Sequence, residues 1–342
     1  MTTLQLGGLA ATVVTTERED EVIEAVGKAD STGEPLLVVG GGSNLVIGDQ
    51  GFAGTVLRMA TRGIDVAKVG DVVHLTAAAG EPWDELVARC VGEQLSGVEC
   101  LAGIPGLTGA VPMQNVGAYG QDVSETIVRV RTWDRTARRI VDFERDDCRF
   151  AYRSSVFRGS AAHVILGVTF ALRKVDASAP IRYAELTRAL GIGEGERAPL
   201  ARVRETVLAL RCGKGMVLDA ADADTRSAGS FFTNPILDAG ALASLRERVV
   251  GVLAAGESMP MFPEADGRTK VSAAWLIERA GFRKGYAAGP VAISSKHALA
   301  LTNRGGATTR DLIALARTIR DGVNAKFGVV LENEPVFVGV SL

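Results

Sequence analysis

The stretch LLVVGGGSNLVIGDQGFAGTVLRMA, residues 36–60, decides how the first part of the chain folds. It opens with an apolar run, residues 36–39, which favours a buried strand. Five small or polar residues follow this strand directly: Gly40, Gly41, Gly42, Ser43 and Asn44. Three consecutive glycines at this place indicate a backbone that approaches another group closely.

A Rossmann dinucleotide-binding motif does not fit this stretch. Its G-x-G-x-x-G fingerprint opens a helix, and here the third glycine position falls on Leu45. Residues 45–47 favour a short strand and residues 48–51 a turn. The Walker motif is excluded because no Lys-Ser or Lys-Thr pair follows the glycines. Two interpretations remain, a strand–loop–strand whose N–H groups form an anion nest and a tight glycine turn without a ligand.

Composition limits the class of protein. The chain has 342 residues, 47% of them apolar and 23% charged, which suffices for two or three domains with their own cores. A formal net charge of −2 argues against nucleic acid or an anionic membrane as the main partner. We find no signal peptide pattern and no apolar run long enough to span a membrane. Four scattered cysteines and three histidines predict no metal site and favour a reducing cytoplasm.

Helical and strand patterns are mixed along the whole chain. A capping-box spacing at residues 16–19 precedes a helical stripe: Val22, Ile23, Val26 and Ala29. Further helices are expected over residues 82–94, 203–211 and 312–327, the last of which stops at Gly328. Strands are expected over residues 128–132, 164–172, 329–331 and 336–340. Residues 173–200 have the character of a polar insert that contains Tyr183.

A second glycine-rich loop occupies residues 97–123. Its glycines and prolines make regular helix or strand implausible: Gly103, Pro105, Gly106, Gly109, Pro112, Gly117 and Gly120. So long an irregular segment inside a compact chain is usually functional, although a plain surface loop is the alternative. Its polar members Gln114, Asn115 and Tyr119 can hydrogen-bond a heterocycle or a ribitol-like chain. Together the two loops predict a grip on one extended cofactor, such as a flavin dinucleotide.

Five motifs in order then resemble one family. They are PLLVVGGGSNLVI at 35–47, GIPGLTGAVPMQNVGAYG at 103–120, AYRSSVF at 151–157, GSFFTNP at 229–235 and LENEPVFVG at 331–339. Over nearly its whole length the chain resembles the UDP-N-acetylenolpyruvoylglucosamine reductases, the MurB family of peptidoglycan synthesis. The insert with Tyr183 is similar to the longer form of that family, in which a tyrosine folds over the substrate.

The resemblance implies an α+β fold, namely the FAD-binding fold of the vanillyl-alcohol oxidase type with a smaller substrate domain. Residues 1–65 would form the first FAD-binding subdomain, and residues 66–219 with 328–342 the second, including the insert at 173–200. Residues 220–327 would bind the substrate. It also implies a cytoplasmic, monomeric enzyme that reduces the enolpyruvyl ether of a UDP-sugar, using non-covalent FAD and NADPH as hydride donor.

The resemblance further implies roles for single residues. Arg153 would stabilise charge on the substrate carboxylate, Ser230 would protonate the carbanion, and Glu334 would assist as a protonated or water-bridged acid. The cofactor-binding positions would be Gly40, Gly41, Gly42, Ser43, Asn44, Gly103, Gly109, Gln114, Asn115, Gly117 and Tyr119. The substrate-binding positions would be Tyr183, Arg211, Lys214, Asn234, Lys284 and His297.

Two positions depart from the family pattern. Ala110 stands where some members have a serine beside the flavin, and Val336 where some have an arginine. If those groups steady flavin or substrate anions, another residue must do so here, and His297 or Lys296 would contribute. Three other functions stay open from the sequence: an oxygen-using oxidase with a covalent flavin, a nucleotide-binding module without catalysis, and a paralogous reductase for another enolpyruvyl nucleotide. The loop GGGSN offers no cysteine or histidine for a covalent flavin bond.

Overall fold

The structure is a computed structural model that describes residues 2–253 and 257–342. The chain forms two compact units. The N-terminal unit comprises Ala10–Gly42 and Phe52–Val217, and the C-terminal unit comprises Met1–Leu9, Ser43–Gly51 and Leu218–Leu342. The border between them falls inside the opening glycine stretch, after Gly42. The three functional segments expected from the sequence are a different division and remain a prediction.

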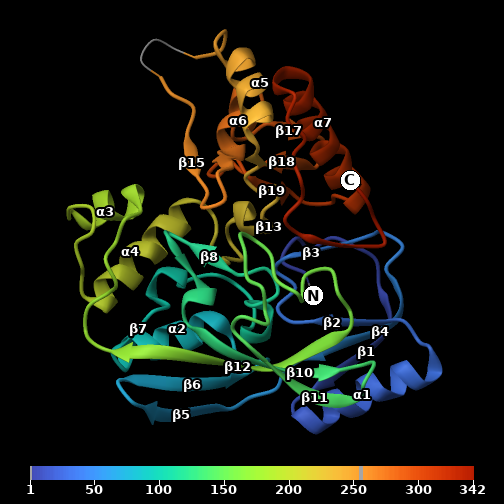
Figure 1. The fold of residues 1–342 in the computed structure, drawn as a ribbon. Coiled ribbons are helices and arrows are strands. Elements are labelled where there is room, and N and C mark those ends of the chain that lie inside the picture. Colours follow the sequence, from blue (N-terminus) through green and yellow to red (C-terminus); the bar gives the residue numbers. More distant parts are fainter. Residues whose placement is uncertain (1, 254–256) are drawn as a thin grey trace. The chain divides into compact units, whose positions relative to one another are not determined.

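The N-terminal unit contains two larger sheets and a two-stranded one, β8 (Gly117–Ala118) with β9 (Gln121–Asp122). A parallel sheet has the order β1 (Ala10–Thr16), β4 (Phe52–Met59), β2 (Leu36–Val39). The second sheet is antiparallel and follows the order β11 (Arg139–Glu144), β10 (Ile127–Asp134), β12 (His163–Lys174), β6 (Val72–Ala78), β5 (Ile64–Val69), with β7 (Leu95–Ser96) beside β12 (Figure 1). Four helices complete it: α1 (Glu19–Thr32), α2 (Trp83–Gly92), α3 (Ala184–Leu190) and α4 (Leu200–Gly213).

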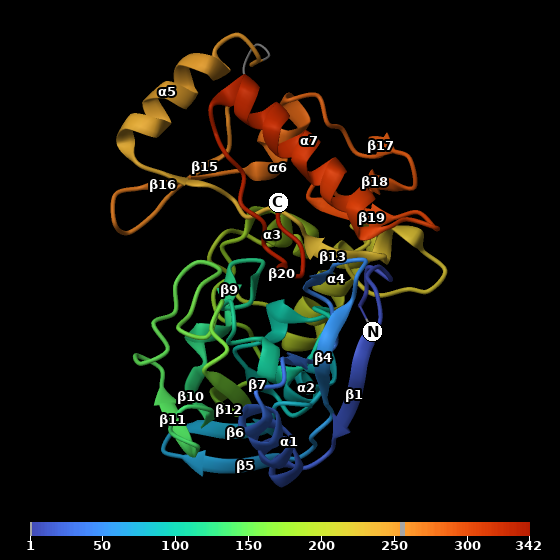
Figure 2. The same ribbon diagram turned by 90° about the vertical axis from the view of Figure 1, so that its right-hand side faces the viewer.

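The C-terminal unit is built on a four-stranded sheet in the order β13 (Ser227–Ser230), β19 (Ala300–Asn303), β18 (Val291–Ile293), β17 (Ala287–Ala288). Helix α7 (Thr309–Phe327) packs on β18 and β19, as Figure 2 shows. Two smaller sheets consist of β14 (Ile236–Leu237), β16 (Thr269–Val271) and β15 (Met261–Pro263), and of β3 (Leu45–Ile47) with β20 (Val336–Val338). Helices α5 (Ala239–Val249) and α6 (Ala273–Arg279) lie between these strands in the sequence.

Apolar periodicity explains most helices. Val22, Val26 and Ala29 of α1 are buried, as their spacing predicts. Helix α7 ends at Gly328, whose φ of 70° is the left-handed conformation that the predicted stop requires. The predicted start of α1 is wrong, because Thr16 pairs with Met59 as the last residue of β1. The helix begins at Glu19, with a capping box between Arg18 and Glu21.

The predicted strand at residues 329–331 is also wrong. This segment has no strand pairing, although Val329 and Leu331 are buried in the core of the C-terminal unit. Burial against α-helical and sheet neighbours produces the same apolar pattern as a strand, so the pattern alone misleads. The following strand is real but shorter than expected, because β20 stops at Val338. Among the described residues, no helix is long and apolar enough to cross a membrane.

Candidate flavin and substrate site

The residues between 97 and 123 form an irregular loop, as predicted. Three short 3-10 turns, Glu99–Leu101, Thr108–Ala110 and Val123–Glu125, alternate with the two-residue strands β8 (Gly117–Ala118) and β9 (Gln121–Asp122). Asn115 and Tyr119 have φ values of 47° and 51°, which non-glycine residues rarely adopt. The loop is therefore held by specific contacts rather than by regular hydrogen bonding.

The two glycine-rich segments of the N-terminal unit lie against each other. A Cβ atom on Gly41 would stand 2.9 Å from the Cα atom of Gly106, and one on Gly40 would stand 3.4 Å from the side chain of Leu107. Gly42 is left-handed, with a φ of 64°. No helix follows, because Ser43 and Asn44 lead as a turn into β3. The absence of a Rossmann helix is thus confirmed, and the glycines allow two backbones to form one narrow cradle that suits an extended cofactor.

Other glycines of the second loop are required by packing. A Cβ atom on Gly109 would stand 2.6 Å from Ala79, and one on Gly117 would collide with the carboxylate of Asp122. Gly103 has a φ of 70° and lies against Leu208. Because glycine has no side chain, the loop backbone can pack closely on these neighbours at the three positions, whether or not they also contact a cofactor.

Asn115 ties the loop to its neighbours. Its side chain is buried, its Nδ2 donates to the carbonyl of Ala151 at 3.1 Å, and its Oδ1 accepts from the N–H of Ser124 at 3.1 Å. Gln114 next to it is half-buried. The amide of Asn115 is therefore engaged within the protein, a role that its residue type does not reveal in the sequence.

Arg153 is held by the same loop. Its Nη2 donates to the carbonyl of Gly117 at 2.7 Å and its Nη1 to that of Asn115 at 3.4 Å, while the carboxylate of Asp122 lies 3.9 Å away. The guanidinium also stacks over the Tyr152 ring at 5.2 Å. Arg153 has a φ of 49°, within a tight turn closed by two hydrogen bonds between Ala151 and Ser154. The turn and the carbonyls together fix where this positive charge lies.

Tyr183, the residue before α3, lies in a group of polar side chains that also contains Tyr119, Glu185 and Lys214. We call this group the polar corner. The Tyr183 ring meets the Tyr119 ring edge-on, with 5.4 Å between centroids. Lys214 lies 5.4 Å from the centre of the Tyr119 ring and forms an ion pair of 2.5 Å with Glu185. Burial raises the pKa of Tyr119 to about 12 and also raises that of Tyr183, so both hydroxyls stay protonated at neutral pH and can donate hydrogen bonds.

Arg211 differs from Lys214 in being buried, with 8% of its surface exposed. Its Nη2 donates to the carbonyl of Met216 at 2.9 Å, whereas its Nε has no hydrogen-bond partner among the described residues. Burial lowers its pKa from the ordinary value of 12.5. In the part of the chain that the structure describes, no carboxylate is hydrogen-bonded to Arg211, and a buried cation of this kind favours an incoming anion, which is compatible with the expected diphosphate.

In the C-terminal unit, Ser230 and Glu334 come from neighbouring backbone segments. Ser230 ends β13 opposite Ala300, after Gly229 with its φ of 73°. The carbonyl of Phe231, next to Ser230, accepts from the N–H of Glu334 at 2.9 Å. The backbone thus places two predicted catalytic residues, about 100 positions apart, beside each other.

The same segment also reaches the end of the opening glycine motif. The N–H of Val336 donates to the carbonyl of Asn44 at 2.9 Å, just before β20 pairs with β3. Val336, the position that departs from the family pattern, is exposed and begins β20. Ala110, the other such position, is exposed at the end of a 3-10 turn.

Three predicted substrate residues lie elsewhere in the C-terminal unit. The Asn234 Oδ1 accepts from the N–H of Ala273 at 2.9 Å, at the start of α6. His297 lies in the turn between β18 and β19, where its carbonyl accepts from the N–H of Ala300. Lys284 is exposed in the turn after α6. The turn that contains His297 leads into Ala300, which pairs with Ser230.

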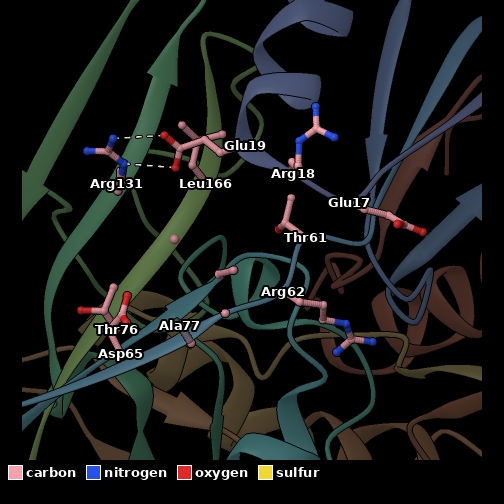
Figure 3. Close-up of a pocket in the computed structure, with 13 residues that line it drawn as sticks. Glu17, Arg18, Glu19, Thr61, Arg62, Asp65, Thr76, Ala77, Arg131 and Leu166 are labelled. Carbon is pink, nitrogen blue, oxygen red and sulfur yellow. Dashed lines mark hydrogen bonds and ion pairs between the residues drawn. The ribbon is translucent and has the colours of Figure 1, made fainter.

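A pocket of about 290 Å³ in the N-terminal unit contains none of the predicted site residues. It lies where β1 and β4 end, and Figure 3 shows Glu19 and Arg131 paired at its wall. Two hydrogen bonds of 3.1 and 3.2 Å join them. Nothing in the pocket indicates a ligand. Within residues 2–253 and 257–342, no group of three histidine, cysteine or acidic side chains could hold a metal ion.

Comparison with known proteins agrees with this geometry. Residues 10–141 match the model of an FAD binding domain, and residues 221–338 match that of the UDP-N-acetylenolpyruvoylglucosamine reductase C-terminal domain. A crystal structure of such a reductase (MurB) from Thermus caldophilus, 23% identical, has a TM-score of 0.67 and covers 98% of this chain and 95% of its own. The predicted α+β FAD-binding fold is thereby confirmed.

Curated relatives are more similar in sequence than this crystal structure is. UDP-N-acetylenolpyruvoylglucosamine reductases from Thermobifida fusca (strain YX) and Streptomyces coelicolor (strain ATCC BAA-471 / A3(2) / M145) are each 57% identical. The alignments cover all of this chain, and 96% and 89% of those two proteins. With this identity over its entire length, the chain belongs to the UDP-N-acetylenolpyruvoylglucosamine reductase family.

Proposed function

We propose that this protein is an FAD-dependent oxidoreductase that reduces UDP-N-acetylglucosamine enolpyruvate to UDP-N-acetylmuramate, with NADPH as electron source, in peptidoglycan precursor synthesis. The observation that supports this most strongly is the 57% identity to reductases of that name over the whole chain. The presence of an FAD binding domain and a reductase C-terminal domain in one chain agrees with it.

The cradle of glycine loops would hold the flavin without a covalent bond. Gly40 and Gly41 lie against the loop at Leu107 and Gly106, and Gly42 follows them, so backbone N–H groups rather than side chains would meet the diphosphate. The remaining proposed contacts come from the sequence motifs: Ser43, Asn44, Gly103, Gly109, Gln114, Asn115, Gly117 and Tyr119. FAD bound there would supply the hydride-transfer chemistry between NADPH and the substrate.

Arg153 would stabilise negative charge on the substrate carboxylate. The carbonyls of Gly117 and Asn115 hold its guanidinium in place, so little reorganisation is required when charge develops. A guanidinium has the two-pronged geometry that suits a pair of carboxylate oxygens. We propose that Asp122 helps to orient this arginine, because its carboxylate lies 3.9 Å away.

Ser230 would donate the proton. Reduction of the enolpyruvyl double bond adds hydride to its terminal carbon and a proton to the carbon next to the carboxylate. The Ser230 hydroxyl would supply that proton and regain one from solvent. Glu334, joined to the Ser230 segment through Phe231, would orient the donor or the attacked group by a hydrogen bond.

The substrate nucleotide would meet the polar corner of the N-terminal unit. We propose that Tyr183, Lys214 and Arg211 bind its diphosphate, since two protonated tyrosines and two cations gather there. Asn234, Lys284 and His297 would contact other parts of the substrate from residues 220–327, the proposed substrate domain. We further propose that the enzyme works as a monomer in the cytoplasm, which sedimentation velocity and cell fractionation would test.

Product analysis tests the proposed reaction. Purified protein is incubated with NADPH and the enolpyruvyl UDP-sugar, and the nucleotide products are analysed by mass spectrometry. We expect a UDP-sugar that has gained two hydrogen atoms, with one NADPH oxidised for each product. Substrate that is unchanged, with NADPH oxidised only by oxygen, would refute the reductase function and support an oxidase. Reduction of a different enolpyruvyl nucleotide alone would indicate a paralogous enzyme.

A further inference from the structure

The turn between β18 and β19 borders the proposed proton donor. It comprises residues 294–299 and contains His297. Its last carbonyl, that of Leu299, accepts from the N–H of Phe231 at 2.7 Å, and Ala300 pairs with Ser230 itself. Any displacement of this turn therefore displaces the backbone on which Ser230 lies.

The side chain of Asp224 also holds this turn, through Ser295. Asp224 is 5% exposed, and its carboxylate accepts from the N–H and the hydroxyl of Ser295 at 2.9 and 2.6 Å. It also accepts from Arg304 Nη1 at 3.0 Å. Ser295 follows β18 and Arg304 follows β19, so one carboxylate binds both ends of a short pair of strands. We call these three residues the Asp224 clamp.

The clamp is itself anchored. The N–H of Asp224 donates to the carboxylate of Asp222 at 2.9 Å, and Asp222 pairs with Lys296, next to Ser295, at 2.6 Å. Burial alone would raise the pKa of Asp224, but the hydrogen bonds from Ser295 and the charge of Arg304 lower it below its ordinary value of 3.8. The carboxylate is therefore charged at neutral pH, and charge-assisted hydrogen bonds are about twice as strong as neutral ones.

We propose that Asp224 is a positioning residue for the substrate half of the reaction, which sets the location of Ser230 and His297 through the turn at residues 294–299. This inference rests on the proposed function. Proton transfer requires accurate placement, and a misplacement of about 1 Å can reduce a rate about 10²-fold. The relay runs from the Asp224 carboxylate through Ser295 to Leu299, and from there to the Phe231 N–H beside Ser230.

A merely structural clamp would produce a different pattern. It would lower the stability of the fold and the retention of FAD, and both half-reactions would slow together. A positioning clamp slows the step in which Ser230 acts and leaves reduction of the flavin by NADPH nearly unchanged. The two half-reactions can be followed separately by the flavin absorbance in an anaerobic stopped-flow instrument.

The test compares Asp224→Asn with the wild-type protein. Asparagine keeps one acceptor for the Ser295 N–H but lacks the charge and the second acceptor oxygen. We expect reoxidation of the reduced flavin by saturating enolpyruvyl substrate to slow about tenfold, with reduction by NADPH within about twofold of wild type. Ser295→Ala should give a smaller change of the same kind, and the double variant should be no slower than Asp224→Asn alone, because both act through one contact.

Asp266→Asn is the matched control. Asp266 also pairs with an arginine of the same unit, Arg268 at 2.7 Å, but both side chains are about half exposed. It should leave both half-reactions at wild-type rates. Should Asp224→Asn fail to fold, Ser295→Ala becomes the deciding variant, because it removes only one donor. Normal reoxidation in the clamp variants, or equal slowing of both half-reactions with loss of FAD, would overturn the inference.

The wild-type trace separates this inference from the proposed function. If the wild-type flavin, once reduced, is not reoxidised by the enolpyruvyl substrate, the proposed function fails and the positioning role fails with it. If the wild type is reoxidised and Asp224→Asn behaves like it, the positioning role alone is wrong.

Discussion

The two units hold their candidate catalytic residues by different means. In the C-terminal unit, Ser230 and Glu334 are placed by the backbone, through a strand pairing at Ala300 and a hydrogen bond at Phe231. In the N-terminal unit, Arg153 lies in a turn with a φ of 49°, and its position depends on side-chain bonds to loop carbonyls. The backbone contacts that place Ser230 and Glu334 remain when their side chains are changed. The position of the Arg153 guanidinium depends on the hydrogen bonds that this side chain itself makes.

This difference determines how variants can be interpreted. A substitution at Ser230 leaves the backbone contacts of β13 in place, so a lost rate reports lost chemistry. A substitution at Arg153 removes two hydrogen bonds that also hold the loop at Gly117. Its effects therefore combine lost charge with loosened structure, and flavin retention must be measured beside the rate.

The largest effect is expected for Ser230→Ala, which tests the residue that backbone contacts hold in place. FAD content and reduction by NADPH should stay near wild type. Reoxidation by substrate should slow by about 10²–10⁴-fold, as is typical when an acid catalyst is lost. Cysteine at this position should restore part of the rate, since a thiol of similar reach is a better acid. Stopped-flow traces of both half-reactions decide it, and wild-type reoxidation in Ser230→Ala would show that this serine is not the donor.

Arg153→Lys tests the residue whose position depends on its own side-chain hydrogen bonds. Lysine keeps the charge but cannot donate to two carbonyls in the same fork. We expect substrate reoxidation to slow by about 10²-fold, together with weaker FAD binding in fluorescence titrations. Arg149→Lys is the control, because Arg149 also has a positive φ, 47°, and is exposed. Unchanged FAD binding with a lowered rate would mean that the hydrogen bonds of Arg153 to the loop carbonyls do not support FAD binding.

The polar corner at Tyr183 should affect binding rather than chemistry. Tyr183→Phe and Lys214→Ala should mainly raise KM for the UDP-sugar, up to about tenfold, because they would hold groups remote from the reacting carbons. Arg211→Ala should raise KM and also lower the melting temperature, since this side chain is buried. Arg188→Ala, an exposed arginine of α3, serves as control. Steady-state kinetics that show unchanged KM in all three variants would favour a purely structural insert.

The smallest effect concerns stability against pH. The pKa of Asp224 is lower in the folded protein than its ordinary value of 3.8. The unfolded chain therefore binds a proton more readily, so this group stabilises the fold above pH 3.8 and loses that contribution as pH falls through its folded pKa. Asp224→Asn should be less stable than wild type by about 1–2 kcal/mol at pH 7, and the gap should narrow below pH 3.8. A gap that is constant with pH in urea titrations would contradict this.

Local patterns predicted much of the fold. Helix α7 and its stop at Gly328 follow from an apolar stripe and one left-handed glycine, both visible in the sequence. The irregular loop at 97–123 follows from its glycines and prolines. The segment at 329–331 shows the limit, because buried apolar residues have the same pattern with or without a partner strand.

The contacts of the site depend on residues far apart in the sequence. Asp224 and Ser295 are 71 positions apart, and Arg153 and Gly117 are 36 apart. No local pattern links such pairs, so motif resemblance could name Arg153, Ser230 and Glu334 but not the groups that hold them. The left-handed backbone at Tyr119 and Arg153 is equally invisible, because these residue types rarely adopt it. Asparagine adopts it more often, but its residue type does not show that Asn115 does so.

The central claim is that the glycine cradle holds an FAD that transfers electrons from NADPH to an enolpyruvyl UDP-sugar. The most direct measurement is the visible spectrum of the purified protein under anaerobic conditions. We predict a yellow protein that releases FAD on heating, is bleached by NADPH, and regains its colour only when the enolpyruvyl substrate is added. A protein that takes up no FAD on reconstitution, or a bleached flavin that the substrate leaves reduced, would contradict the account.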